Sequence, residues 1–124
     1  SGKDGGLLRA QKKFSDGKDI GFVGEVTSVD ANVLLDLLEK DFLPIICPIG
    51  LGEDYQTYNI NADDAACAIA QAVHAEKLAF LSDVEGICTD PADASTLISE
   101  LTIQEGKQLI EKGTITGFRN FIAV

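Results

Sequence analysis

The sequence predicts an α/β fold in which helices alternate with the strands of a mainly parallel sheet. Residues 43–49 and 78–81 are nearly continuous apolar runs, which are typical of strands covered on both faces. Apolar residues recur at helical spacing within residues 30–40, 62–74 and 102–112. This alternation predicts right-handed crossover connections between the strands.

The size and composition suit one ordinary domain. The chain has 124 residues, of which 45% are hydrophobic, enough to build a core. No run reaches the roughly 18 apolar residues of a membrane span. The net charge of −10 argues against nucleic acid and anionic membranes as partners.

Turn and capping residues mark where the elements begin and end. Two short apolar stretches, residues 7–14 and 20–26, predict a hairpin across a turn at residues 15–19. Thr102 and Glu105 have the spacing of a capping box at the start of the last helix, and Gly113 is placed to end it.

Three cysteines, Cys47, Cys67 and Cys88, are odd in number and widely spaced. Their small or apolar neighbours predict buried thiols in a reducing, cytoplasmic environment. No Cys-x-x-Cys pair or histidine cluster indicates a metal site. The single histidine, His74, is expected near a helix end, where its charge would complement the helix dipole.

A polar cluster stands between the first apolar run and the helix that follows it. Asn59, Asn61, Asp63 and Asp64 lie where free backbone N–H groups and a positive dipole end would meet a ligand. An equally good interpretation is that Asn61 caps the helix and the aspartates only favour its first turn.

A second polar segment, residues 82–86, follows the run 78–81. The carboxyl ends of parallel strands meet at one sheet edge, so we expect this segment to lie beside Asn59 and Asp63. Taken alone, it is also an ordinary glycine-containing turn.

Charge is distributed unevenly. Residues 1–20 have a balance of +2, so the rest of the chain carries −12. Between Asp41 and Gly106 one base, Lys77, stands against twelve acidic residues. Chemistry on a phosphoryl group needs cations around it, and this stretch cannot supply them unaided.

The segment Tyr58–Ala66 resembles the signature of N-acetylglutamate kinases, members of the amino-acid kinase family. Further segments resemble that family in the same order, and the likeness extends from Ser1 to about Thr116. These segments are residues 1–8, 20–26, 81–87 and 95–101.

The resemblance implies an open α/β/α sandwich with a mainly parallel sheet, here incomplete. Residues 1–75 would form the rear of a substrate-binding half, and residues 76–124 the front of a nucleotide-binding half. The implied reaction is transfer of the γ-phosphoryl group of ATP, with Mg²⁺, to the side-chain carboxylate of N-acetyl-L-glutamate in arginine biosynthesis. The complete protein would be a homo-oligomer.

The resemblance also implies roles for individual residues. Asn59 would bind the amino-acid substrate, and Asp63 would orient catalytic lysines. The remaining residues that match would line the nucleotide pocket: Asp83, Val84, Glu85, Gly86, Ile87, Cys88, Thr114, Ile115 and Thr116.

Two departures from the family pattern matter. The family's catalytic lysine and glycine-rich loop would precede Ser1, and a second catalytic lysine is expected near Ile122, where Arg119 does not replace it. We therefore expect a fragment that is inactive alone. Another amino-acid kinase, a non-catalytic binding module of this fold, and a fragment that associates with itself are the alternatives.

Overall fold

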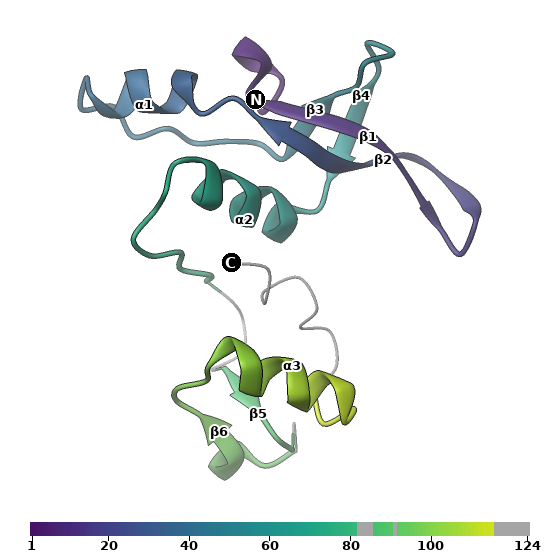
Figure 1. Ribbon diagram of the computed structural model, residues 1–124, viewed down its shortest axis with the longest axis vertical. Helices are drawn as coiled ribbons and strands as arrows, with labels where there is room; N and C mark the ends of the chain where they lie inside the picture. Colours follow the sequence, from purple (N-terminus) through teal and green to yellow (C-terminus); the bar gives the residue numbers. More distant parts are fainter. Residues whose placement is uncertain (82–85, 91, 116–124) are drawn as a thin grey trace. The chain divides into compact units, whose positions relative to one another are not determined.

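The computed structural model describes residues 1–81, 86–90 and 92–115. The chain divides into two compact units, an N-terminal unit, Ser1–Leu78, and a C-terminal unit, Ala79–Val124 (Figure 1). Helices and strands alternate along it, so the predicted α/β class is confirmed.

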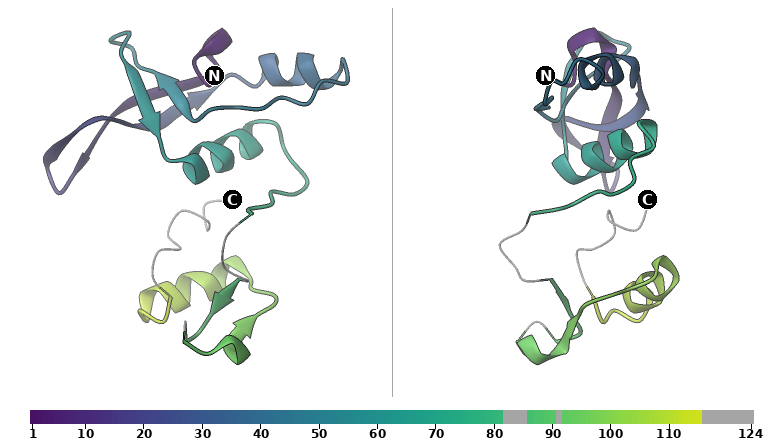
Figure 2. Two further views of the ribbon diagram at one scale, coloured as in Figure 1. Left: turned by 180° about the vertical axis from the view of Figure 1, so that it is seen from behind. Right: turned by 90° about the vertical axis from the view of Figure 1, so that its left-hand side faces the viewer.

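The N-terminal unit contains four strands and two α-helices after a short 3₁₀ turn, Asp4–Gly6. The elements are β1 (Leu8–Ser15), β2 (Lys18–Val29), α1 (Asn32–Leu38), β3 (Ile49–Leu51), β4 (Thr57–Ile60) and α2 (Ala62–Ala72). The strands close into a barrel in the order β1-β2-β4-β3. Helix α2 lies along this set of strands and contacts β2 (Figure 2).

The pairing of these strands is mixed rather than mainly parallel. β1 with β2 and β3 with β4 are antiparallel, whereas β1 with β3 and β2 with β4 are parallel. Short connections explain the antiparallel pairs, because a parallel neighbour needs a long crossover.

The predicted hairpin is confirmed as β1 and β2. Its two turn residues, Asp16 and Gly17, have φ of 49° and 74°, the left-handed values that a two-residue hairpin turn requires. The register is irregular farther along: Lys12 pairs with Gly24, but Phe14 pairs with Asp19. Strand β2 therefore carries extra residues opposite Lys13.

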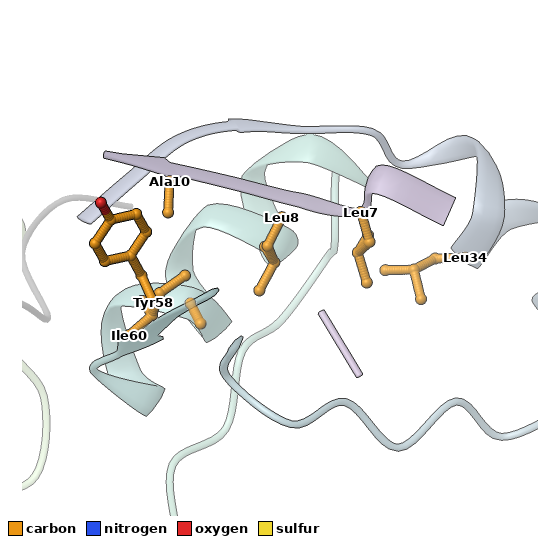
Figure 3. Packing of buried hydrophobic residues seen from close by; sticks show 7 residues of the cluster. Leu7, Leu8, Ala10, Leu34, Tyr58 and Ile60 are labelled. Atoms are coloured by element: carbon orange, nitrogen blue, oxygen red, sulfur yellow. The ribbon is translucent and has the colours of Figure 1, made fainter. Parts of the chain in front are cut away.

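The core of the N-terminal unit joins strands and helices that are distant in sequence (Figure 3). Leu8 and Ile60 are fully buried. The other members of the cluster are Leu7, Ala10, Leu34, Tyr58 and Ala65. Two glycines permit this close packing: a Cβ on Gly24 would lie 2.6 Å from the Tyr58 Cβ, and one on Gly50 would lie 2.7 Å from the Ile60 Cδ1.

Two predicted strands are wrong. Residues 43–48 form no strand, β3 begins only at Ile49, and the side chains of Leu43 and Ile45 are 86% and 89% exposed. Residues 78–81 also form no strand, and Leu81 is fully exposed. Apolar composition alone does not make a strand, because the backbone needs a neighbour to pair with. Residues 43–47 and 78–81 pair with no described strand.

The cysteines are only partly as predicted. Cys67 is buried, but Cys88 is half-buried and Cys47 is exposed. Cys47 lies in the residues 43–48 that were expected to form a covered strand, so its exposure follows from the same error.

The C-terminal unit is built from short elements: β5 (Ile87–Cys88), a 3₁₀ turn (Ala94–Thr96), β6 (Leu97–Ile98) and α3 (Ile103–Glu111). β5 and β6 are antiparallel. The predicted capping box of Thr102 and Glu105 is present, and Gly113 follows the helix with φ of 72°. None of the helices in the described ranges has the length and apolar character to cross a bilayer.

Candidate functional site

Strand β4 presents Asn59 on the side opposite to the core. Its neighbours in the strand, Tyr58 and Ile60, are buried, whereas Asn59 is exposed, as alternation along a strand requires. Asn59 pairs with Val23 of β2 on one side and with Ile49 of β3 on the other. The candidate substrate-binding amide is therefore held on a paired backbone and faces away from the packed interior.

Helix α2 begins immediately after this strand, and Asn61 is its cap. The Asn61 Oδ1 accepts hydrogen bonds from the N–H groups of Asp63 at 3.0 Å and Asp64 at 3.1 Å. The capping interpretation is thus confirmed for Asn61. Because Asn61 caps the helix, the carboxylates of Asp63 and Asp64 are not needed as caps. Both residues are half-buried in the first turn, and their carboxylates are available to interact with other groups.

A basic residue that the sequence analysis did not single out reaches this turn. The Lys13 Nζ of β1 lies 4.0 Å from the Asp64 Oδ2. The pair joins residues far apart in the chain, so no local motif predicts it. The charge balance does give a signal, because residues 1–20 hold an excess of bases that an acidic stretch elsewhere can attract.

One turn farther along α2, Cys67 faces the interior. Burial raises the pKa of its thiol, and the charges of Asp64 and Asp63 add to the effect. A thiol with a raised pKa stays protonated at neutral pH and is a poor nucleophile. Cys67 is therefore a packing residue of the helix that carries Asp63.

A cavity of about 320 Å³ opens on the N-terminal unit, lined by Ala10, Gln11, Lys12, Thr27, Glu53, Asp54 and Tyr58. The Tyr58 hydroxyl donates to the Asp54 Oδ2 at 2.7 Å, and the Gln56 N–H donates to the Asp54 Oδ1 at 3.0 Å. These hydrogen bonds, chiefly that of Tyr58, lower the pKa of Asp54, and the bond to Asp54 raises the pKa of Tyr58.

The candidate nucleotide-binding residues belong to the C-terminal unit. Asp83, Val84, Glu85 and Thr116 lie outside the described residues. Of the others, Gly86 has φ of 154°, Ile87 and Cys88 form β5, and Thr114 and Ile115 follow α3. That residues 82–86 lie beside Asn59 and Asp63 stays a prediction, as does the division of the chain into substrate and nucleotide halves.

No group of three or more His, Cys, Asp or Glu side chains that could hold a metal ion occurs among the described residues. The departures near Arg119 and Ile122 fall in residues 116–124, which lie outside that description.

Comparison with known proteins gives consistent matches. The model of the amino acid kinase family matches residues 1–122. The acetylglutamate kinase of Campylobacter jejuni subsp. doylei is 54% identical over 111 residues, covering 90% of this chain and 39% of that protein. The acetylglutamate kinase of Desulforamulus reducens is 48% identical over 118 residues, covering 94% of this chain and 41% of that protein. The chain thus spans about two-fifths of these relatives.

Solved structures share the fold. An N-acetylglutamate synthase from Neisseria gonorrhoeae, complexed with coenzyme A and L-arginine, matches with a TM-score of 0.80 at 28% identity, over 96% of this chain and 27% of that chain. The protein smu.665 from Streptococcus mutans UA159 matches with a TM-score of 0.77 at 28% identity, over 94% of this chain and 45% of that chain.

Proposed function

The chain belongs to the amino acid kinase family, and from this premise we propose that it is part of an N-acetylglutamate kinase. The proposed reaction transfers the γ-phosphoryl group of ATP to the side-chain carboxylate of N-acetyl-L-glutamate in arginine biosynthesis. The observation that carries the proposal is the placement of Asn59, exposed near the end of β4 and shortly before the first turn of α2, which holds Asp63. The sequence identity to acetylglutamate kinases, 54% and 48% for the two relatives described above, supports the proposal.

Asn59 would bind the amino-acid substrate. A side-chain amide offers both a donor and an acceptor, which suits a ligand carrying carboxylates and an N-acetyl group. Its paired backbone holds the amide in a defined direction. Positioning of this kind accounts for much of the rate in phosphoryl transfer.

Asp63 would orient lysines rather than remove a proton. A side-chain carboxylate as acceptor is already ionised at pH 7, because its ordinary pKa is about 4. The lysines must come from elsewhere in the complete protein, because residues 41–106 contain a single Lys or Arg, Lys77. Asp63 thus acts through charge and hydrogen bonding.

ATP would be bound in the C-terminal unit by Gly86, Ile87, Cys88, Thr114 and Ile115, with residues 83–85 and 116. Mg²⁺ would arrive on the nucleotide phosphates, a common arrangement for this ion, and would neutralise their charge. The described residues hold no acidic cluster that would bind it independently. We also propose that the complete protein is a homo-oligomer. A cytoplasmic location is proposed as well, because the cysteine usage favours a reducing environment.

One observation favours an alternative. The fold also occurs in a protein named as a synthase, the N-acetylglutamate synthase from Neisseria gonorrhoeae, and is therefore not restricted to proteins named as kinases. The alternatives are therefore a non-catalytic binding module of this fold and another amino-acid kinase. Binding without turnover would support the binding module, and a panel of substrates tested on the complete protein would decide between the kinases.

The test is calorimetry with N-acetyl-L-glutamate and MgATP titrated separately into the chain. We expect heat from N-acetyl-L-glutamate, none from L-aspartate, and loss of the signal in Asn59→Ala. Asn32→Ala, which removes another exposed amide of the same unit, is the matched control and should bind normally. Absence of heat with both ligands, or normal binding by Asn59→Ala, would overturn the proposed site.

A further inference from the structure

The candidate substrate site has an electrostatic difficulty. Asp63 and Asp64 are adjacent and half-buried in the first turn of α2, and the proposed substrate carries two carboxylates of its own. Like charges repel strongly where side chains are partly removed from water. A cation close to these aspartates would remove part of that repulsion.

Lys13 is the residue placed to do this. Among the described ion pairs it is the one base that reaches the first turn of α2, with its Nζ 4.0 Å from the Asp64 Oδ2. Its neighbour Lys12 is engaged elsewhere, with Asp19 at 2.7 Å. The pair is only partly exposed, with 43% of the Lys13 side chain and 28% of the Asp64 side chain accessible.

The backbone of the hairpin explains how Lys13 comes to this position. Lys13 has no partner in the register of β1 with β2, because the pairs step from Lys12–Gly24 to Phe14–Asp19. Such irregularities redirect a side chain away from the regular alternation of a strand. Val23, one of the extra residues of β2, is itself paired with Asn59. The irregular part of the hairpin therefore borders the candidate substrate-binding strand.

We propose that Lys13 is a positioning residue of the substrate site, which neutralises Asp64 so that an anionic acceptor can approach Asn59 and Asp63. This inference rests on the proposed function for its ligand. Lys13 acts through Asp64 and not by contact with the reacting groups. It supplies from β1 a positive charge that the acidic stretch of residues 41–106 nearly lacks.

The test compares the dissociation constant for N-acetyl-L-glutamate in four proteins: the unsubstituted chain, Lys13→Met, Lys13→Met with Asp64→Asn, and the control Lys12→Met. We expect Lys13→Met to weaken binding about two- to fivefold, the range set by partly exposed ion pairs. The second substitution should restore binding, because it removes the unpaired negative charge. High salt should shrink the difference, and Lys12→Met should bind normally.

Equal binding by Lys13→Met and Lys12→Met, or no recovery in the double variant, would overturn the role of Lys13 and leave the proposed function standing. If the unsubstituted chain binds no N-acetyl-L-glutamate, the proposed function fails instead. Amide hydrogen exchange of Asp63 and Asp64 then decides whether Lys13 orders this turn. Exchange should be faster in Lys13→Met than in Lys12→Met, and equal rates would contradict the inference.

Discussion

Every buried hydrophobic residue that the structure describes lies in the N-terminal unit, whereas among the described residues of the C-terminal unit only Gly106 is buried. The first unit joins β1, β4, α1 and α2 around Leu8 and Ile60. The second is ordered by short-range polar contacts. Thr96 Oγ1 accepts from the Asp90 N–H and donates to backbone oxygen, and Asp93 accepts from Ser95.

Because of this difference, we expect the two candidate sites to lie on units of different stability. Burial of apolar surface is the main favourable term in folding, and local hydrogen bonds exposed to water contribute little. Asn59 and Asp63 stand on the packed unit, and Ile87 and Cys88 on the weakly packed one. We therefore expect the residues that would bind ATP to open more readily than those that would bind the amino acid.

The largest expected effect comes from the core of the N-terminal unit. Leu8→Ala should lower its free energy of unfolding by about 2–5 kcal/mol, because it leaves a cavity at a fully buried position. Urea denaturation followed by tyrosine fluorescence reports on this unit alone, since both tyrosines belong to it and the chain has no tryptophan.

The matched control is Leu97→Ala in the C-terminal unit, where the side chain is 42% exposed. It should leave the tyrosine transition unchanged. A large shift of that transition would mean that the two units unfold together, which would contradict the proposed difference in their stability.

Thiol modification compares the two units directly. Cys67 is buried with a raised pKa, and Cys88 is half-buried. In variants that keep only one cysteine, Cys67 should react at least about tenfold more slowly than Cys88, equivalent to about 1.4 kcal/mol of additional protection. The exposed Cys47 gives the unprotected rate. Equal rates for Cys67 and Cys88 would contradict the proposed difference in stability.

Helix caps test the same contrast with a smaller change. Asn61→Ala and Thr102→Ala each remove a side chain that caps an α-helix, at a cost of about 1 kcal/mol. In the N-terminal unit the loss should appear as an earlier cooperative urea transition. In the C-terminal unit it should appear only as faster amide exchange within α3. Asn61→Ser and Thr102→Ser keep a capping oxygen and should restore most of the loss.

Features set by neighbouring residues could be predicted from the sequence, and features set by distant partners could not. The cap at Asn61, the capping box at Thr102 and the hairpin turn at Asp16 each depend on a few adjacent residues, and all were expected. Residues 43–48 and 78–81 were wrongly assigned to strands, because pairing requires a partner that composition does not reveal.

The candidate site divides in the same way. The resemblance of Tyr58–Ala66 to a known signature was enough to select Asn59 and Asp63. The approach of Lys13 to Asp64 depends on the register of β1 with β2 and on the position of α2, and neither can be derived from local sequence.

The smallest expected effect concerns the hydrogen bond from Tyr58 to Asp54. This bond raises the pKa of Tyr58, because the neutral phenol is the form that donates. A raised pKa in the folded state gives stability that is complete below the ordinary value near 10 and is lost as pH rises through the folded value. For Asp54, whose pKa is lowered, the contribution is present above its ordinary value near 4 and is lost as the pH falls.

Absorbance of tyrosinate measures this directly, because the chain has two tyrosines and Tyr55 is 85% exposed. Tyr55→Phe isolates the titration of Tyr58, which should occur at higher pH than that of Tyr55 in the matched Tyr58→Phe variant. Asp54→Asn should bring the two titrations together, because it removes the negative charge beside the phenol. Coincident titrations in the unsubstituted background would mean that the Tyr58–Asp54 bond is not maintained in solution, and the packed unit would then be looser at this cavity than its core implies.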